Sequence, residues 1–519
     1  MNQQPAGANH LLSGAFSAAL SAILLTLAFP GPGLDWVAWV ALVPLMVAVQ
    51  GMAPKQGFYL GLGAGVVHFV SLLYWIVPTI QTYGGISLVL AISVLVLLAF
   101  YLALYVGLFC AGMTLFSRHS IWMPLGAGAL WVGGEYLRAS LFTGFPWGLL
   151  GSCLYTQTTL IQVADLTGVY GVSFVIVMVN ASLARAWVLH GTKNSLGRVA
   201  VSMIPCVVAL VLVVAYGRMR VAEMDLAMDG AEKTRVSVVQ GNISQAEKWD
   251  LQYQESTVDT YCDLSRQAAT EKPDLIVWPE TALPFYYGLD QALSDRVDQC
   301  IRQVKTWFLV GSPALGENSQ GYTYYNRAHM INRFSVTTDR YDKVHLVPFG
   351  EYVPLGRYLS FLGKLTAQAG DFTPGKKQSL PLRYDRGSAG VLICFEVIFP
   401  GLARNMVNNG AKILVTITND AWFGRTSAPA QHFSMAVFRA IENRRAVARA
   451  ANTGISGFID PLGRIMATTD LYTRTTLTRS LPMVNTVTLY SIAGDWFAMI
   501  CLVAMALVFM VKRGFRKVF

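Results

Sequence analysis

The chain has 519 residues, of which 54% are hydrophobic and 13% charged, and its formal net charge is +10. Soluble globular proteins carry about 25% charged residues, so this composition excludes an ordinary soluble protein. Much of the basic charge flanks apolar segments, where it serves membrane orientation and lipid head-group contact. The positive charge therefore does not predict nucleic-acid binding.

Apolar runs dominate the first 217 residues and return near the end of the chain. About 20 apolar residues cross a bilayer, and eight runs are close to this length. They are residues 11–30, 34–51, 57–79, 85–116, 120–138, 166–189, 197–217 and 491–511. The sequence predicts a polytopic α-helical bundle, with spans 1–7 in residues 1–217, an extramembrane domain in residues 218–490, and span 8 with a tail in residues 491–519.

Lysine and arginine predict the orientation of this bundle. Eight spans place both termini on one side, and the loops and tail on that side contain most of the nearby basic residues: Lys55, Arg118, Arg185, Lys193, Arg198, Lys512, Arg513, Arg516 and Lys517. The loops near 31–34 and 80–84, on the other side, contain none. Basic loops stay in the cytoplasm, so both termini are expected there and residues 218–490 in the periplasm of a bacterium. The N-terminus lacks a basic region before its apolar run and is expected to be a retained helix.

The loop 139–165 is expected on the same side as the domain. It contains the stretch Thr-Gly-Phe-Pro-Trp-Gly, in which the tryptophan is Trp147. Aromatic residues beside a membrane favour an anchor at the interface. The alternative is a floor beneath the domain, with Trp147 in contact with a substrate.

Residues 218–490 alternate short apolar runs with amphipathic stretches. Continuous apolar runs such as 413–417 indicate strands buried on both faces. The predicted strands are 236–240, 275–278, 307–311, 327–332, 389–394, 413–417 and 454–459, and the predicted helices are 252–270, 290–305, 397–408 and 430–448. This pattern predicts an α/β domain with helices outside the sheets.

Three segments of this domain place a reactive side chain beside an apolar strand. Leu-Ile-Val-Trp-Pro-Glu ends at Glu280, Tyr-Asp-Lys-Val-His contains Lys343, and Gly-Val-Leu-Ile-Cys-Phe-Glu contains Cys394. Ligand sites of α/β sheets gather where strands end. Each residue alone has an ordinary explanation, because strand-end cysteines are usually inert core residues.

Taken together, Glu280, Lys343 and Cys394 resemble the Glu-Lys-Cys set of the carbon–nitrogen hydrolase (nitrilase) superfamily. The strings Trp-Pro-Glu-Thr-Ala, Tyr-Asp-Lys-Val-His-Leu-Val-Pro-Phe-Gly-Glu and Ile-Cys-Phe-Glu carry the resemblance, which covers nearly all of residues 233–485. With eight predicted spans around such a domain, the whole chain resembles the bacterial apolipoprotein N-acyltransferase family. The resemblance implies an αββα sandwich for the domain.

The chemistry of these three residues is consistent with catalysis by a thiol. A thiol attacks well only as a thiolate, so Cys394 needs a base. Glu280 is expected to be that base, with a pKa raised by a partly apolar cleft. Lys343 is expected to supply positive charge where a tetrahedral oxyanion forms, with the backbone N–H of Phe395 as a second donor.

Four further residues have expected supporting roles. The resemblance implies that Glu351 and Glu396 hold Lys343 and steer Glu280, whereas ordinary ion pairing is the alternative. Asn326 and Trp249 match family motifs and are expected to position groups or contact substrate. For Trp249, simple packing is an equally open interpretation.

The resemblance also implies an activity, which is ping-pong acyl transfer. An acyl chain passes from a phospholipid, with phosphatidylethanolamine as the expected donor, to Cys394 as a thioester. It then passes to the α-amino group of the diacylglyceryl-cysteine of an apolipoprotein. The expected location is the bacterial cytoplasmic (inner) membrane, with the lipid bilayer as a partner and the chain as a monomer. No cofactor or metal is predicted, because the seven cysteines form no CxxC pair and no Cys/His spacing suits zinc.

Residues 354–365 are apolar with interspersed basic residues, so Tyr358, Phe361 and Leu362 are candidates for contact with acyl chains. A mobile arm that dips into the membrane interface and a helix packed on its own domain are both open.

Three other functions stay open from the residues alone. A membrane-anchored nitrilase-like amidase would use water as acceptor, although an anchor needs one span and not eight. A Cys–His hydrolase would use His345 or His432, but capping or packing at a helix start explains His432. A transporter or receptor would need charged residues within its spans, for which Glu135 and Asp165 are candidates.

Overall fold

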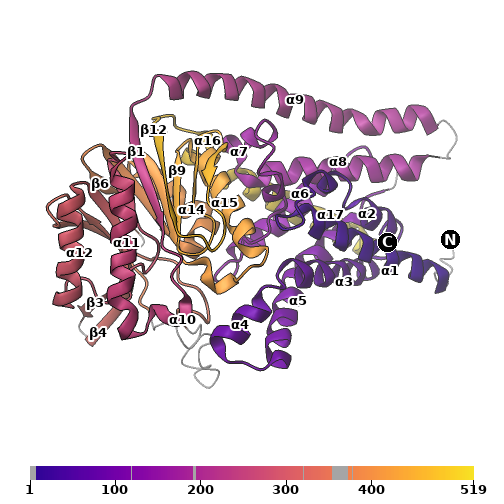
Figure 1. Cartoon of the computed structure of the whole chain (residues 1–519). Helices are drawn as coiled ribbons and strands as arrows, with labels where there is room; N and C mark the ends of the chain where they lie inside the picture. The colour runs from indigo at the N-terminus through magenta and orange to yellow at the C-terminus, as the bar shows by residue number, and fades with distance from the viewer. Residues whose placement is uncertain are drawn as a thin grey trace. The chain divides into compact units, whose positions relative to one another are not determined.

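The computed structural model describes residues 8–117, 120–190, 195–318, 321–352, 372–376 and 378–518. The chain forms two compact units, whose elements are labelled in Figure 1. The first unit comprises Met1–Val77, Leu88–Arg220 and Asp495–Phe519, and the second comprises Pro78–Ser87 and Val221–Gly494.

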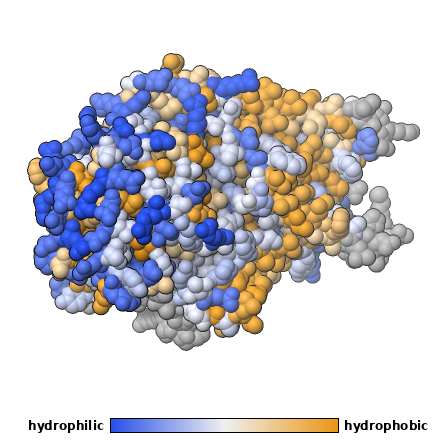
Figure 2. Space-filling model, in the orientation of Figure 1, coloured by the Kyte–Doolittle hydropathy of each residue, from blue (hydrophilic) through white to orange (hydrophobic). Residues whose placement is uncertain are grey.

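The first unit is helical. Its elements are α1 (Ala8–Ala28), η1 (Asp35–Trp39), α2 (Val43–Ala48), α3 (Pro54–Leu72), α5 (Leu88–Met113), α6 (Met123–Ser140), η2 (Leu150–Leu154), η3 (Leu160–Val163), α7 (Ala164–Thr167), α8 (Val169–Leu189), the first part of α9 (Ser195–Asp229) and α17 (Trp496–Val518). Large apolar side chains are exposed along α5, α9 and α17, and Figure 2 shows apolar surface over the helices of this unit. Such a surface suits lipid better than water.

Three helices of the described residues have the length and composition needed to cross a membrane. They are α5, α8 and the part of α9 from Gly197 to Asp229. The pair α3 and α4 (Ile76–Gly84), bent by 53° at their junction, is a fourth if it forms one broken span. These helices support the prediction that the chain is a membrane protein, whereas the count of eight spans stays a prediction.

The predicted span 34–51 is not one helix, because it divides into η1 and α2. Backbone N–H and C=O groups that lose their helical hydrogen bonds need other hydrogen-bond partners where water is scarce. Asn180 of α8 supplies them: its Oδ1 accepts from the Leu42 N–H at 2.8 Å and its Nδ2 donates to the Ala38 carbonyl at 2.8 Å. A single buried amide therefore stabilises the break.

Small residues bring α3 and α5 close together. Gly57, Gly61 and Gly65 follow one another at four-residue spacing on α3. A Cβ on Gly61 would lie 2.6 Å from Cys110 Sγ, and a Cβ on Gly65 would lie 2.8 Å from the Ala103 Cα. This is the close packing that small residues at i, i+4 permit between membrane helices.

The second unit contains two six-stranded sheets. One has the order β12-β1-β2-β3-β4-β5 and the other β11-β10-β9-β8-β7-β6. The strands are β1 (Lys233–Gln240), β2 (Leu275–Val277), β3 (Trp307–Asn318), β4 (Gly321–Ile331), β5 (Thr337–Asp342), β6 (Leu382–Tyr384), β7 (Gly387–Ile393), β8 (Ile413–Thr418), β9 (Val447–Ala451), β10 (Gly457–Ile459), β11 (Ile465–Thr468) and β12 (Thr475–Pro482). The trio β1, β2 and β3 is parallel, and so is the trio β7, β8 and β9.

Helices cover the outer face of each sheet. α11 (Gln254–Ala269) and α12 (Gln291–Val304) pack together beside the first sheet, and α14 (Pro400–Asn408) and α15 (Ala428–Asn443) pack on the second (Figure 1). Contacts between β1 and β9 place the sheets face to face. The other helices of the described residues in this unit are α10 (Gln245–Lys248), η4 (Leu251–Tyr253), η6 (Cys394–Ile398), η7 (Asp420–Phe423) and α16 (Leu489–Ala493). The expected αββα sandwich is confirmed.

Candidate active site

The three predicted reactive residues follow strands at the same edge of their sheets. Glu280 comes just after β2, Lys343 directly after β5, and Cys394 directly after β7. β5 runs antiparallel to β4, which runs antiparallel to β3, so β5 has the direction of β2 and β3. All three residues therefore lie at carboxyl ends of parallel strands, where α/β folds form their sites.

Packing fixes the turn that carries Glu280. Trp278 is fully buried, and its Nε1 donates to Ser265 Oγ of α11 at 2.9 Å. Gly311 of β3 passes so close that a Cβ there would lie 2.5 Å from the Pro279 carbonyl oxygen. A buried anchor on one side and a glycine on the other therefore set the position of the carboxylate.

Glu280 and Lys343 meet in a buried cluster with two other side chains. Lys343 Nζ lies 3.3 Å from Glu280 Oε1 and 3.0 Å from Glu351 Oε1. Asn326 Nδ2 donates to the same two oxygens, at 2.7 and 3.1 Å. Glu280 Oε2 accepts the backbone N–H of Asn419 at 3.0 Å. All of these donors restrain the Glu280 carboxylate, and the Glu351–Lys343 ion pair fits both the implied supporting role and ordinary ion pairing.

The charges of this cluster set the protonation state of Glu280. Burial raises the pKa of Glu280, but Lys343 and the Asn326 amide outweigh burial, so the pKa lies below its ordinary value. Burial lowers the pKa of Lys343, but Glu351 and Glu280 outweigh it and raise that pKa. The predicted raised pKa of Glu280 is thus wrong, because the Lys343 ammonium group, directly after β5, compensates for the apolar surroundings. Glu280 is ionised at neutral pH and can accept a proton.

Cys394 occupies a strained turn at the start of η6. Its φ is +52°, a left-handed conformation that costs a non-glycine residue on the order of 1–3 kcal/mol. All seven cysteines are buried and free, so this turn distinguishes Cys394 where burial does not. Burial raises the pKa of its thiol, Glu280 raises it further, and Lys343 lowers it. The resting thiol is protonated and needs a base.

Glu396 connects the loop of Lys343 to the turn of Cys394. Its Oε1 accepts the N–H groups of Val344 and His345 at 2.7 and 3.0 Å, and its Oε2 accepts the N–H of Ile393 at 2.7 Å. The Tyr341 hydroxyl lies 2.9 Å from both oxygens. Glu396 therefore holds backbone on both sides of the site, and its bonds reach the Lys343 loop and not the expected Lys343 side chain.

Comparison with known proteins agrees with this geometry. Residues 21–182 match the apolipoprotein N-acyltransferase N-terminal domain family, and residues 235–489 match the carbon–nitrogen hydrolase family. The apolipoprotein N-acyltransferase of Geobacter metallireducens is 42% identical to the chain, over 95% of this chain and 94% of the relative. The chain belongs to the apolipoprotein N-acyltransferase family. The family member from Methylococcus capsulatus is 33% identical over 91% of both chains.

Solved structures give a weaker likeness. The carbon–nitrogen hydrolase from Helicobacter pylori is 17% identical, and the similarity covers 48% of this chain and 89% of that one with a TM-score of 0.37. The fold assignment rests on the family matches and on the two sheets. The match over residues 235–489 includes the whole cluster of Glu280, Asn326, Lys343, Glu351 and Cys394.

Candidate residues for substrate contact differ in their surroundings. Trp249 is 38% exposed, at the end of α10, whereas Trp147 is 1% exposed and its ring lies 4.9 Å from that of Trp75. Burial of Trp147 supports packing over an interfacial anchor, and its substrate contact stays a prediction, as does that of Trp249. Tyr358, Phe361 and Leu362, with the segment 354–365, lie outside the residues that the structure describes.

Lys248 is a site residue that the sequence did not single out. It is 2% exposed, and its Nζ donates to the Glu280 carbonyl oxygen at 3.3 Å and to Thr281 Oγ1 at 2.5 Å. Burial lowers the pKa of Lys248 to about 8, although Glu280 and Cys394 act in the opposite direction. A lysine in a polar stretch beside Trp249 gave no signal of burial.

The histidines proposed as alternative bases occupy other positions. His345 stacks on Phe399 with 3.8 Å between ring centroids, and burial lowers its pKa to about 4. His432 Nε2 lies 3.1 Å from the main-chain carbonyl oxygen of Cys394. Its bond to Cys394 therefore reaches the backbone and not the sulfur, and its full burial within α15 agrees with the packing that the sequence offered as one explanation.

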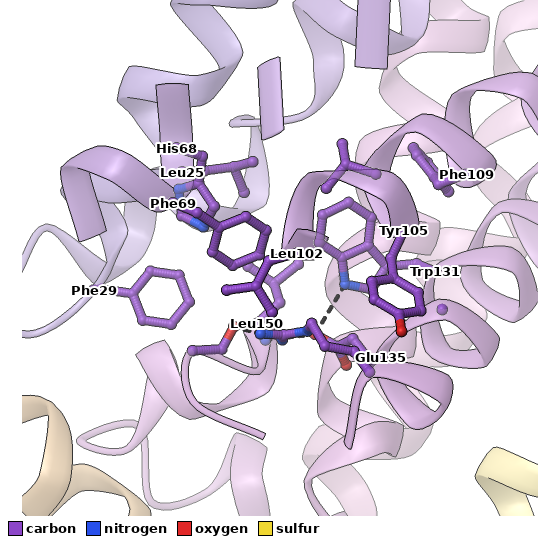
Figure 3. A pocket seen from close by; sticks show the side chains of 14 residues that line it. Leu25, Phe29, His68, Phe69, Leu102, Tyr105, Phe109, Trp131, Glu135 and Leu150 are labelled. Atoms are coloured by element: carbon purple, nitrogen blue, oxygen red, sulfur yellow. Dashed lines mark hydrogen bonds between the residues drawn. The ribbon is translucent and has the colours of Figure 1, made fainter. Parts of the chain in front are cut away.

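Charged residues of the helical unit have structural partners. Glu135 lines a cavity with aromatic side chains (Figure 3), and its Oε1 accepts Trp131 Nε1 at 3.0 Å and the Leu150 N–H at 2.7 Å. Asp165 accepts the Tyr216 hydroxyl at 2.7 Å and Arg220 Nε at 2.9 Å. The Glu135 bond to Leu150 holds irregular backbone, and the Asp165 bonds join α7 to α9. These structural contacts explain both charged residues without a transport function.

Proposed function

We propose that the chain transfers an acyl chain from a membrane phospholipid to the α-amino group of the diacylglyceryl-cysteine of apolipoproteins, through a thioester on Cys394. The observation that carries this proposal is the strained Cys394 turn beside the ionised Glu280–Lys343 pair in a member of this family. Glu280, Lys343 and Cys394 are the proposed catalytic residues, in a catalytic domain of residues 218–490.

The first half-reaction acylates Cys394. Glu280 takes the thiol proton as sulfur attacks the ester carbonyl of the phospholipid, which gives a tetrahedral oxyanion. Lys343 and the backbone N–H of Phe395 are proposed to stabilise this oxyanion, and one such donor is commonly worth about 3 kcal/mol. Collapse of the intermediate breaks the ester C–O bond, and Glu280 returns the proton to the departing lysophospholipid oxygen. The lowered pKa of Glu280 supports this role, because the base is ionised at rest.

The second half-reaction transfers the acyl group. The α-amine of the acceptor attacks the thioester carbonyl, and Glu280 takes the amine proton. The intermediate then expels the Cys394 thiolate, which receives that proton, and an amide remains. A thioester is more reactive toward amines than the oxygen ester that formed it, so each step is easier than direct aminolysis.

A helical unit embedded in the membrane suits two substrates whose acyl chains stay in a bilayer. We propose eight spans, cytoplasmic termini, and a periplasmic catalytic domain in a monomer of the bacterial inner membrane. Phosphatidylethanolamine is the proposed donor. The apolar surface of α5, α9 and α17 supports contact with the bilayer.

Supporting residues take the positions that the geometry gives them. Asn326 and Glu351 orient Glu280 and Lys343 directly, and Glu396 orients the backbone around them. Trp249 is proposed as a substrate contact, because it is partly exposed and adjoins Lys248, which binds the backbone of Glu280.

Labelled phospholipid tests the proposal. Phosphatidylethanolamine with a labelled acyl chain should label the protein, and neutral hydroxylamine should release the label because it cleaves thioesters. Cys394→Ala should abolish labelling, whereas Cys262→Ala, which removes another buried cysteine of the same domain, should leave it unchanged. Absence of label on the wild-type protein, or its persistence in Cys394→Ala, would contradict the mechanism.

The acceptor decides between acyl transfer and the amidase alternative. The trapped acyl group should pass to the amine of a diacylglyceryl lipopeptide faster than to water. Hydrolysis at the same rate with and without lipopeptide would favour the membrane-anchored hydrolase.

A further inference from the structure

A buried histidine behind Cys394 has no part in the chemistry described so far. His432 lies in α15 and is fully buried. Its Nε2 is 3.1 Å from the Cys394 carbonyl oxygen, and its Nδ1 is 3.1 Å from Asp420 Oδ1 and 3.0 Å from Arg449 Nη2. Polar partners therefore hold both ring nitrogens.

These partners determine where the ring carries its proton. A carbonyl oxygen only accepts, so Nε2 must donate to Cys394. Burial and the charge of Arg449 lower the pKa of His432, so the ring is neutral and Nδ1 is its acceptor. Arg449 Nη2 donates to that nitrogen and, at 2.8 Å, to Asp420 Oδ2. Arg449, which Asp420 holds in place, thus fixes the orientation of the imidazole, and Asp420 Oδ1 receives no proton from Nδ1 in this tautomer.

The bond from His432 fixes the peptide plane that follows the nucleophile. A trans peptide is planar, and its C=O and N–H point in opposite directions. Because the Cys394 C=O points toward His432 in α15, the N–H of Phe395 points away from α15. The Cys394 φ of +52° is unfavourable for a residue with a side chain, so the backbone of this turn depends on restraints such as the His432 bond.

We propose that His432 is a positioning residue that directs the Phe395 N–H toward the oxyanion formed at Cys394. The bond to the carbonyl also polarises the peptide, which makes its N–H a stronger donor. This inference rests on the proposed acyl transfer, since only a carbonyl substrate forms an oxyanion. It gives His432 a role in stabilising the transition state and none in removing the thiol proton.

Two reactions of Cys394 separate these roles. Acylation by labelled phosphatidylethanolamine passes through an oxyanion, whereas alkylation by iodoacetamide does not. Both need a reactive thiol. A residue that only directs an oxyanion donor therefore affects the first rate and leaves the second unchanged.

The test uses the full-length protein in phospholipid–detergent micelles with single-turnover kinetics. His432→Phe keeps an aromatic ring but lacks the donor. Loss of one oxyanion donor lowers rates by about 100- to 1000-fold, and a misdirected donor should cost less, so we expect acylation to fall about 10- to 100-fold. Alkylation at Cys394, followed by mass spectrometry, should stay within about twofold.

Matched variants control for packing. The amide nitrogen of glutamine reaches the position of Nε2, whereas that of asparagine reaches only the position of Nδ1. His432→Gln should therefore recover most of the acylation rate and His432→Asn should not, which keeps the test available if His432→Phe fails to fold. His329→Phe replaces another buried histidine of the domain, which binds Ser312, and should not separate the two rates.

The outcomes distinguish this inference from the proposed function. If the wild-type protein forms no labelled adduct, the proposed function is wrong. If it does, and His432→Phe and His432→Asn acylate at the wild-type rate, only the role of His432 is wrong. Equal losses of acylation and alkylation would also overturn it, because they would assign His432 to thiol activation or to general stability.

Discussion

Glu396 connects two elements of the site, and Glu396→Gln tests that connection. The carboxylate accepts three backbone N–H groups and the Tyr341 hydroxyl while it is fully buried. Glutamine has the same shape but one acceptor oxygen. If that oxygen keeps the N–H groups of Val344 and His345, the new NH₂ group faces the N–H of Ile393, and both are donors.

The loss of stability follows from these contacts. One orphaned buried N–H costs about 1–3 kcal/mol. We therefore expect Glu396→Gln to lower the free energy of unfolding by about 1–3 kcal/mol at pH 5, where the Glu396 carboxyl, with its raised pKa, is protonated and both side chains are neutral. Acylation should also fall, because the loop of Lys343 and the turn of Cys394 lose their common acceptor.

The same carboxyl predicts a pH dependence. Burial raises the pKa of Glu396 to about 7. The folded protein therefore keeps a proton that the unfolded chain releases, and the stability from this group is present below the ordinary pKa and lost as pH rises through about 7. Wild-type unfolding in urea, measured between pH 4.5 and 8, should include this decline, and Glu396→Gln should lack it.

Hydrogen exchange locates the effect. Exchange at the amides of Val344, His345 and Ile393 should increase in Glu396→Gln, while the amides of α12, which make no bond to Glu396, keep the wild-type order of protection. Wild-type stability and wild-type exchange at these three amides would refute the reasoning, because they would mean that the carboxylate contributes nothing to joining the two elements.

Three further changes have defined outcomes. Lys248 loses its charge as pH rises through about 8, so the wild-type acylation rate should decline there, while Lys248→Met should be slow throughout and lack this step. Gly311→Ala places a Cβ 2.5 Å from the Pro279 carbonyl oxygen. It should lower the free energy of unfolding by about 1–3 kcal/mol and reduce the acylation rate. The control Gly401→Ala, with open space around the new Cβ, should alter neither thermal unfolding nor activity. Arg138→Met removes a buried charged donor from two loop carbonyls and should destabilise the helical unit by about 3 kcal/mol or more, measured as the unfolding midpoint in detergent.

The fold of the second unit could be predicted where hydropathy follows burial. The run 413–417 is β8, buried at every residue. β9 was missed and the helix 430–448 was extended over its start, because Val-Ala-Arg-Ala-Ala also suits a helix. In the structure α15 ends at Asn443, Arg444 takes a φ of +50°, and Arg449 sits fully buried in β9 against Asp420. This buried arginine pairs with a carboxylate 29 residues away in the sequence, and hydropathy does not contain that information.

The site could be predicted as a set of residue types but not as a charge distribution. The order of Glu280, Lys343 and Cys394, with the family resemblance, predicted these residues as the reactive groups. Glu280 and Cys394 follow apolar strands as expected, whereas Lys343 follows β5, which is polar and mostly exposed. The sign of the Glu280 pKa shift depended on donors from β4 and β5, whose distances only the fold provides. The burial of Lys248 and the backbone role of Glu396 likewise depend on tertiary contacts, so the sequence did not single out Lys248 and did not predict the backbone partners of Glu396.

The arrangement of charge explains why the site needs fixed donors on two sides. The buried cluster has two carboxylates, Glu280 and Glu351, and one ammonium group, Lys343. In the proposed mechanism, the thiol proton neutralises Glu280 while the negative charge moves to the oxyanion beside Cys394. Lys343 is placed to remain near this charge throughout. The Phe395 N–H becomes important only after the transfer, so its direction must be set in advance by bonds that the reaction does not use, and the bond from His432 meets this condition.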